Sequence, residues 1–265
     1  MNIWVVSGCS SGLGRTWTES IINERKEIVI GITRSEASAE EMVSLYSERF
    51  IPCIADVRDE KSLKEQLTAL AHQIGTPNRV VTCAGYAQFG TLEDLSNQQL
   101  REQFETNIEG TLNVIRPLLP LMRTLEEARI LLVSSMSGVA CWPLLGAYQM
   151  SKYAIEALGE TMRLELEDTP IQIGIIEPGP HKTGWATVSA KRQKVSDYYD
   201  EEALKSRVSC GFQVEDPTAS LPFFWHMFDQ TQMPLRIATS KPFVDMVCEK
   251  SMENMQLLRG SFEQL

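Results

Sequence analysis

The sequence predicts an α/β fold, a single doubly wound domain in which helices flank a parallel sheet of about seven strands. Short apolar runs rich in β-branched residues alternate with longer helical patterns, which is typical of βαβ units around a parallel sheet. The chain has 265 residues with 43% hydrophobic content, enough for one large core and close to the upper size of a single domain. We therefore expect one domain over residues 1–265.

Seven apolar runs are the predicted strands. They are Ile3 to Ser7, Glu27 to Thr33, Phe50 to Ala55, Arg79 to Cys83, Ile130 to Ser134, Ile171 to Ile176 and Leu235 to Ala238. Two helical stripes are clear between them. The first has Asn107 as its polar member, and its positions step by four and three along Leu100, Phe104, Asn107, Thr111, Val114 and Leu118. The second runs from Ala147 to Met162 and ends before Thr169-Pro170.

From about residue 184 to residue 216 the pattern becomes polar and irregular. Such a stretch in a compact domain is typical of a functional loop, so we expect a substrate loop or lid with some helix there. The aromatic run from Pro222 to Trp225 is expected to cover a pocket or join an interface.

Charge and cysteine usage exclude several classes of function. The net charge of -10 and the lack of a Lys/Arg-rich block argue against a nucleic-acid surface. No basic region precedes an apolar run at the N-terminus, and no segment is long and apolar enough to span a bilayer, so we expect a cytoplasmic protein with no membrane partner. The six cysteines are scattered singly, and no His, Cys, Asp or Glu cluster has metal spacing. We expect no metal and no disulfide framework.

A glycine-rich turn follows the first predicted strand and opens a helix. It reads Ser7-Gly8-Cys9-Ser10-Ser11-Gly12-Leu13-Gly14. Glycines in this position let the backbone approach a pyrophosphate, whose charge then meets the free N–H groups of a helix N-terminus. An ordinary tight turn has the same composition, but strand, glycine turn and helix here occur in the order that a dinucleotide site requires.

Tyr148 and Lys152 stand four residues apart at the start of the second helical stripe. On a helix they lie on one face, where an ammonium favours the phenolate and lowers the pKa of the tyrosine. The pair is then a device for acid-base chemistry near neutral pH. The same spacing also fits an ordinary solvated helix face.

Several ordered motifs resemble the short-chain dehydrogenase/reductase family over almost the whole chain. The glycine turn matches at Gly8, Gly12 and Gly14, and Asp56-Val57 matches the pair that holds the adenine. Thr82-Cys83-Ala84-Gly85 stands where the family commonly has Asn-Asn-Ala-Gly, so two asparagines are missing. The positions of the family's catalytic tetrad are occupied by Asn107, Ser135, Tyr148 and Lys152, and the nicotinamide-facing segment by Pro178-Gly179-Pro180 and Thr183.

The resemblance implies a Rossmann-type domain and a role for each tetrad residue. Tyr148 is expected to exchange the proton, Lys152 to lower its pKa and hold the nicotinamide ribose, and Ser135 to orient the substrate oxygen. Asn107 is expected to bend its helix and hold a water near the lysine. The cofactor-binding residues are expected to be Gly8, Ser10, Ser11, Gly12, Leu13, Gly14, Thr33, Arg34, Asp56, Val57, Ala84, Gly85, Tyr148, Lys152, Pro178, Gly179 and Thr183.

NADP(H) is the expected cofactor, with NAD(H) as the alternative. A carboxylate at the end of the second strand would bind the ribose hydroxyls of NAD and repel the extra phosphate of NADP. Thr33 and Arg34 stand there instead, and a guanidinium makes charge-assisted contacts to phosphate. Arg34 would otherwise be a solvated loop residue.

The expected function is hydride transfer between nicotinamide and a carbonyl or alcohol. Ser135, Tyr86, Trp142 and Trp185 are the expected substrate contacts, with Cys141, Pro143, Leu144, Tyr198 and Tyr199 as further candidate walls. Their apolar character favours a ketone, aldehyde or secondary alcohol. A catalytically idle NADP-binding sensor or scaffold is the alternative, and a sugar-nucleotide epimerase or dehydratase is a third. A homodimer or homotetramer is expected from the resemblance.

Overall fold

The computed structural model, which describes residues 1–208 and 213–263, contains a parallel sheet of seven strands in the order β3-β2-β1-β4-β6-β7-β9. The strands are β1 (Ile3–Ser7), β2 (Ile28–Thr33), β3 (Phe50–Ile54), β4 (Arg79–Thr82), β6 (Ala128–Val133), β7 (Ile171–Glu177) and β9 (Arg236–Ala238). All seven predicted strands are present, and the predicted fold class is confirmed. The strand order reverses between β1 and β4, which is where doubly wound sheets bind their ligands.

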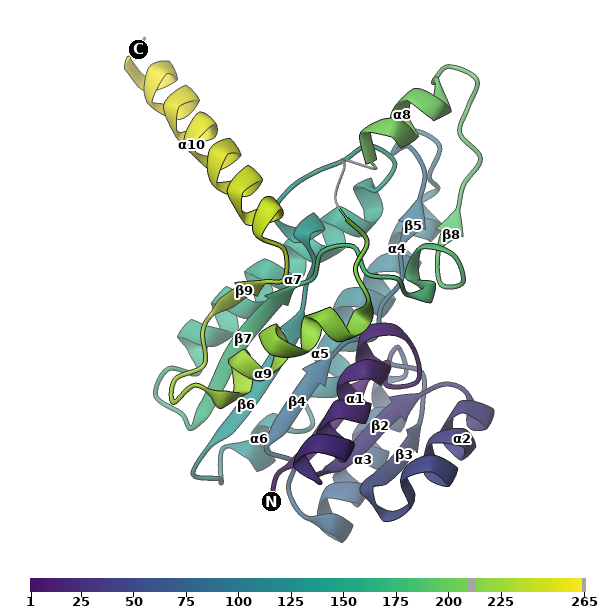
Figure 1. Ribbon diagram of the computed structural model, residues 1–265, viewed down its shortest axis with the longest axis vertical. Coiled ribbons are helices and arrows are strands. Elements are labelled where there is room, and N and C mark those ends of the chain that lie inside the picture. The colour runs from purple at the N-terminus through teal and green to yellow at the C-terminus, as the bar shows by residue number, and fades with distance from the viewer. Residues whose placement is uncertain (209–212, 264–265) are drawn as a thin grey trace.

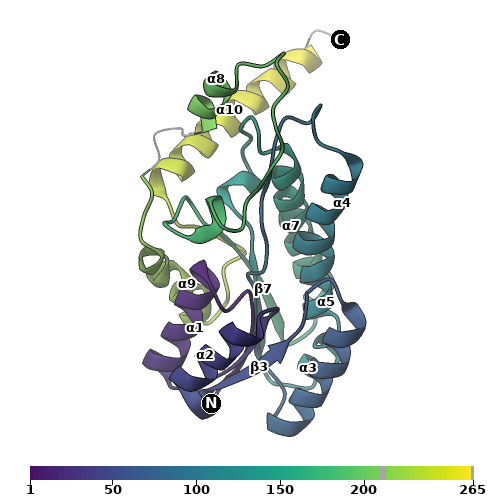
Figure 2. The same cartoon turned by 90° about the vertical axis from the view of Figure 1, so that its right-hand side faces the viewer.

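Helices cover both faces of the sheet, as Figures 1 and 2 show. One face carries α1 (Gly12–Arg25), α2 (Glu36–Tyr46) and α9 (Leu221–Asp229). The other carries α3 (Glu60–Ile74), α4 (Asn97–Phe104), α5 (Gly110–Ile115), α6 (Leu119–Met122) and α7 (Gly146–Glu165). Each face buries its own apolar cluster, because side chains on successive strand residues point to opposite sides.

The aromatic run of α9 belongs to the core. Phe224 is fully buried, stacks on Trp17 at 5.0 Å between ring centroids, and lies 5.9 Å from Trp4. The expectation that this run covers the pocket is therefore wrong. Burying large rings against the sheet stabilises the fold more than exposing them at a rim would.

The predicted stripe around Asn107 forms a helix with an irregular turn. Between α4 and α5 the backbone makes a π-helical turn over Glu105–Glu109, and Asn107 lies inside it. At the amino end of α4, the Ser96 side chain accepts from the Gln99 backbone and the Gln99 side chain accepts from the Ser96 backbone, which is a capping box. Such π turns are frequent at functional sites.

The segment from 184 to 216 contains three short elements among its described residues. These are a 3₁₀ turn at Gly184–Ala186, β8 (Lys191–Arg192) and α8 (Glu201–Val208), and β8 pairs with β5 (Gln88–Phe89). This small sheet was not predicted, because strands of two residues show no alternation. Residues 209–212 of the expected loop lie outside the described residues. Figure 1 shows β8 and α8 at the upper end of the molecule, far from α2.

The last helix, α10 (Lys241–Glu263), projects from the body of the domain (Figures 1 and 2). Its first turn is anchored by Phe243, which is 1% exposed, whereas Leu257 and Leu258 are exposed. Among the described residues, no helix combines the length and the apolar character needed to cross a membrane.

Candidate active site

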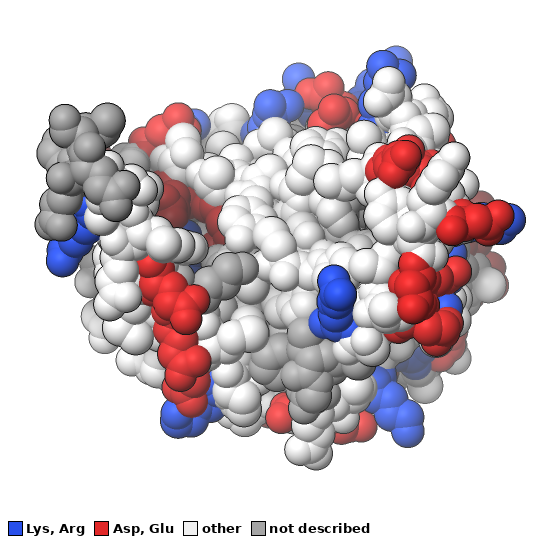
Figure 3. All heavy atoms as spheres, turned by 90° about the horizontal axis from the view of Figure 1, so that it is seen from above, with Lys and Arg blue, Asp and Glu red and all other residues white. Residues whose placement is uncertain are grey.

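A cavity of about 1090 Å³ opens at the carboxyl ends of the central strands. Figure 3 views this end of the molecule, where uncharged side chains dominate the centre and acidic ones gather toward the margins. Fourteen of the expected catalytic, cofactor-binding and substrate-contacting residues line the cavity. They are Gly8, Ser11, Gly12, Leu13, Ala84, Gly85, Ser135, Trp142, Tyr148, Lys152, Pro178, Gly179, Thr183 and Trp185.

The glycine turn fits a dinucleotide pyrophosphate. Gly8 and Gly12 have φ of +69° and +52°, a region that favours glycine, and a Cβ on Gly14 would overlap the carbonyl oxygen of Gly8. Ser11 is the N-cap residue of α1, but its side chain accepts no hydrogen bond from the backbone N–H groups of the first turn. These donors and the helix dipole favour an anion at this position.

Ser135, Tyr148 and Lys152 converge at the centre of the cavity. Lys152 Nζ lies 5.7 Å from the centroid of the Tyr148 ring and donates a hydrogen bond of 2.8 Å to the carbonyl oxygen of Val133. Ser135 follows β6, and its hydroxyl accepts a hydrogen bond of 3.1 Å from the Ser137 N–H and lies close enough to the Tyr148 phenol to lower its pKa. The first turns of α7 thus present Tyr148 and Lys152 to the end of β6.

Burial controls the protonation of these groups. It raises the pKa of the Tyr148 phenol above its ordinary value, and the hydrogen bond from Ser135 offsets only part of this. Burial also lowers the pKa of Lys152 to about 8, against the opposing effect of Cys83 and Glu156. The expectation that Lys152 brings the pKa of Tyr148 toward neutrality is wrong for the protein alone, because the ammonium donates to a backbone carbonyl and the phenol is desolvated.

Cys83 stands where the family commonly has asparagine, and it lines the cavity beside Lys152. Burial raises the pKa of its thiol to about 11. The thiol therefore stays neutral and offers no nucleophile at physiological pH.

Asn107 lies beneath the cavity rather than in its wall. Its Nδ2 donates to the Tyr86 carbonyl oxygen at 3.1 Å and to Ser151 Oγ at 3.0 Å, while its Oδ1 accepts from the Tyr86 N–H at 3.1 Å. At 1% exposure the side chain ties the π-helical turn to α7 and to the segment after β4. Asn107 thus holds α7 in place at Ser151, the residue before Lys152.

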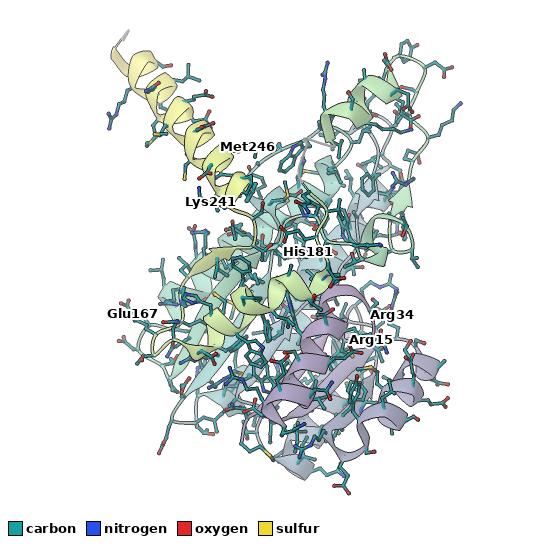
Figure 4. All side chains as sticks on the ribbon, viewed as in Figure 1. Arg15, Arg34, Glu167, His181, Lys241 and Met246 are labelled. Atoms are coloured by element: carbon teal, nitrogen blue, oxygen red, sulfur yellow. The ribbon has the colours of Figure 1, made fainter. Side chains whose placement is uncertain are left out.

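The remaining expected cofactor residues lie beside the cavity, outside its lining. Ser10 accepts from Thr33 Oγ1 at 3.2 Å, and Arg34 is 74% exposed with Nη1 3.7 Å from Asp56 Oδ2. The Arg58 guanidinium hydrogen-bonds Asp56 and holds the pKa of that carboxyl below its usual range. Figure 4 labels Arg34, just before α2, and Arg15, in the first turn of α1. Val57, a buried residue, completes this group through its carbonyl oxygen, which accepts from Asn113.

Aromatic rings form one wall of the outer cavity. The centroid of the Trp185 ring lies 5.0 Å from that of Tyr148 and 5.8 Å from that of Phe89. Trp142 and Leu144 also line the space. The wall is therefore largely apolar around the Tyr148 ring.

Several candidate wall residues lie elsewhere. Tyr86 does not line the cavity, and its ring lies 5.0 Å from Lys191 Nζ. Cys141 and Pro143 are also outside the lining. Tyr198 is 91% exposed, and the Tyr199 hydroxyl donates to Glu93 at 2.6 Å. Proximity in sequence to a motif did not place these side chains in the site, because turns direct neighbouring residues to different sides.

The cavity also has walls that the sequence did not single out. Among them are Phe89, Met136, Ser137, Leu145, Val188, Arg192, Glu201, Lys205 and Val208. Five of these residues come from β5, β8 and α8, and the pairing of β5 with β8 is a long-range contact without a sequence signal. Within the described parts of the chain, no group of three or more His, Cys, Asp or Glu side chains could hold a metal ion.

Comparison with known proteins agrees with this geometry. The family model described as short chain dehydrogenase matches residues 2–194. An uncharacterized oxidoreductase, YusZ of Bacillus subtilis, is 35% identical over 191 residues, covering 70% of this chain and 67% of the relative. The NADPH-dependent 3-dehydrocapnine reductase of Ornithobacterium rhinotracheale is 30% identical over 207 residues, covering 75% and 73%.

A solved structure extends the similarity to the full fold. The crystal structure of a short-chain dehydrogenase from Streptomyces avermitilis superposes with a TM-score of 0.90 at 26% identity, covering 99% of this chain and 96% of the other. The glycine turn, the convergent Ser135, Tyr148 and Lys152, and the parallel sheet all accord with these matches. The chain belongs to the short-chain dehydrogenase family and is an oxidoreductase of that type.

Proposed function

We propose that the chain is an NADPH-dependent reductase of an apolar ketone or aldehyde, or in reverse a dehydrogenase of the corresponding alcohol. The observation that carries the proposal is one cavity with a glycine turn at one end, Ser135, Tyr148 and Lys152 at its centre, and aromatic rings at the other. This arrangement lets a cofactor and an apolar substrate meet beside a proton donor.

Each residue has a distinct part in the proposed reaction. The bound nicotinamide supplies the hydride. Tyr148, which is protonated at neutral pH because burial raises its pKa, donates a proton to the substrate oxygen. The Ser135 hydroxyl orients that oxygen, and Lys152 in its cationic form stabilises the phenolate that remains after proton transfer. Asn107 holds α7 against the π-helical turn between α4 and α5 through Ser151.

The decisive experiment compares Tyr148→Phe with Tyr153→Phe. Turnover of a panel of ketones, followed at the NADPH absorbance band, should fall by about 10²–10⁴-fold in Tyr148→Phe while NADPH still binds. Tyr153 is the next tyrosine on the same helix and is 42% exposed, so its phenylalanine variant should keep wild-type turnover.

The outcomes also separate the alternative functions. Wild-type protein that binds NADPH and reduces no carbonyl would be a sensor or scaffold. Conversion of a sugar nucleotide without net consumption of NADPH would indicate an epimerase or dehydratase. Activity confined to polar or phosphorylated carbonyls would refute the apolar substrate.

We propose NADPH over NADH because the residue immediately after β2 carries an exposed guanidinium and not a carboxylate. Arg34 is 74% exposed and lies 3.7 Å from Asp56, so its side chain is free to turn toward a ribose phosphate. The 3-dehydrocapnine reductase that resembles this chain is named as NADPH-dependent, which supports the choice.

Dissociation constants of NADPH and NADH test this choice. Wild-type protein should bind NADPH more tightly, and Arg34→Asp should reverse the order, since a carboxylate repels the extra phosphate. Arg25→Asp makes the same charge change at the far end of α1, where Arg25 pairs with Asp229 at 2.6 Å, and should leave the order unchanged. Equal or tighter binding of NADH by the wild type would sink the assignment.

We also propose a homodimer or homotetramer in the cytoplasm. The outer face of α7 exposes Met150 and Tyr153, at 40% and 42%, which suits packing against a second copy. The described cysteines Cys9, Cys53, Cys83, Cys141 and Cys248 are free thiols, which suits a reducing compartment. Light scattering and cell fractionation test the two points.

A further inference from the structure

Arg236, on the edge strand β9, lies among carboxylates that the proposed mechanism does not use. Its Nε lies 2.9 Å from Glu156 Oε2 and 3.5 Å from Glu177 Oε1, and its Nη2 pairs with Glu160. Glu156 and Glu177 are 5% and 6% exposed. One guanidinium therefore faces three carboxylates, two of which are buried, and removing it would leave buried charges without their partner.

The two buried carboxylates belong to the two segments that meet at the reaction centre. Glu156 lies one helical turn beyond Lys152 on α7. Glu177 is the last residue of β7, immediately before Pro178 and Gly179, which line the cavity. The Arg236 side chain consequently joins the helix of the proton-transfer residues to the strand that leads into the nicotinamide-facing segment.

The residues after β9 hold the same segment through the backbone. The Thr239 N–H donates to the Glu177 carbonyl oxygen at 3.2 Å, and Thr239 Oγ1 accepts from the Gly179 N–H at 3.0 Å. Thr239 is 4% exposed, so these bonds are shielded from water. Arg236 thus contacts the Glu177 side chain, and Thr239 hydrogen-bonds the backbone of Glu177 and Gly179.

We propose that Arg236 is a positioning residue, which by bridging Glu156 to Glu177 fixes Lys152 relative to the Pro178–Gly179 segment. The inference rests on the proposed function, because this relative position matters only if the two segments act on one cofactor and one substrate. Displacement of reacting groups by about 1 Å costs on the order of 100-fold in rate, so a buried bridge at this point has a kinetic consequence.

The bridge also has an electrostatic side. Burial raises the pKa of Glu177 to about 7 and raises that of Glu156, while Arg236 opposes the shift in both. The charged and titratable groups that face this pair are Lys152, Tyr153 and Glu160 from α7 and Arg236 from β9. The charge of Glu156 raises the pKa of Lys152, so the network favours the ammonium form of that residue.

Arg236→Gln tests the bridge, with Arg163→Gln as the matched control. Arg163 also joins α7 to the sheet, donating to the carbonyl oxygens of Ile173 at 2.7 Å and Met233 at 2.9 Å, but farther from Lys152 along the helix. Both variants should lower the melting temperature. Arg236→Gln alone should lower kcat/KM by roughly ten- to a hundredfold and weaken NADPH binding, and Arg236→Lys should restore part of both.

Glu156→Gln adds a second measurement, the pH profile of kcat/KM, which would not change if the bridge only stabilised the fold. Removing the negative charge near Lys152 lowers the pKa of the ammonium, so the alkaline limb of the kcat/KM profile should move to lower pH. Wild-type kcat/KM and NADPH affinity in Arg236→Gln, together with an unmoved limb in Glu156→Gln, would overturn the proposal. If the wild type turns over no carbonyl, the proposed function fails, and the bridge still predicts a raised NADPH dissociation constant in Arg236→Gln but not in Arg163→Gln.

Discussion

The two ends of the cavity are built by different means. At the glycine turn the backbone itself forms the wall, because Gly8 and Gly12 adopt positive φ and Gly14 packs too closely against the Gly8 carbonyl oxygen to carry a side chain. At the other end, Trp185, Phe89 and Trp142 form the wall with their side chains, on segments with little regular structure of their own. The difference teaches that the end proposed for the nicotinamide cofactor is shaped by backbone geometry, whereas the end proposed for the substrate is shaped by side chains, which substitution can change without altering the backbone.

The largest expected effect comes from disturbing the backbone end. A Cβ on Gly14 would overlap the Gly8 carbonyl oxygen, so Gly14→Ala must displace either the turn or the start of α1. We expect the free energy of unfolding to fall by about 1–3 kcal/mol. We also expect NADPH to bind too weakly for its dissociation constant to be measured by titration. Thermal melts and NADPH titration measure both.

Gly260→Ala provides the control for this substitution. Gly260 lies in α10, and a Cβ there meets nothing within 4 Å. The melting temperature should stay equal or rise slightly, since alanine favours a helix. If Gly14→Ala and Gly260→Ala had the same melting temperature and the same NADPH affinity, the claim that backbone packing shapes the glycine-turn end would be contradicted.

Lys152, which lies between the two ends of the cavity, should make kcat/KM depend on pH. With the pKa of Lys152 near 8, kcat/KM for reduction should fall about tenfold per pH unit above that value as the ammonium is lost. Lys152→Arg keeps its charge and should lose this alkaline limb. A wild-type profile flat to pH 10 would contradict the role of the ammonium.

Lys152 also affects the stability of the fold, and this contribution rises with pH whereas the activity falls. The ordinary pKa of lysine is 10.5 and that of Lys152 in the fold is about 8, so between these values the unfolded chain binds more protons. The contribution of Lys152 to the free energy of unfolding therefore increases as pH rises from 8 to 10.5. Urea unfolding of the wild type and Lys152→Met at pH 8 and pH 10 should show a smaller pH increment in the variant.

The smallest expected effect comes from the side-chain end. Trp185→Ala removes two ring contacts, at 5.0 Å to Tyr148 and 5.8 Å to Phe89. We expect kcat/KM for an aromatic ketone to fall by about tenfold, from the loss of roughly 0.5–1.5 kcal/mol per ring pair, with NADPH affinity unchanged. Tyr198→Ala, at a ring 91% exposed outside the cavity, should change neither value. A drop in NADPH affinity in Trp185→Ala would show that the two ends are coupled.

Much of the fold was predictable from local patterns. Each of the seven strands is an apolar run long enough to be recognised, and the glycine turn has few other uses between a strand and a helix. The tetrad positions follow from a resemblance of ordered motifs, and the structure brings Ser135, Tyr148 and Lys152 into one cavity. Tyr86 failed as a wall residue because the backbone after β4 turns its ring toward Lys191.

By itself the sequence determined the parallel α/β sheet, the position of the glycine turn, and the spacing of Tyr148 and Lys152, because each depends on residues close together in the chain. Only the tertiary structure decided that burial raises the pKa of Tyr148, that Asn107 braces the site from beneath, and that Arg236 bridges Glu156 and Glu177. These features depend on desolvation and on contacts between segments far apart in sequence, which periodicity and spacing do not encode.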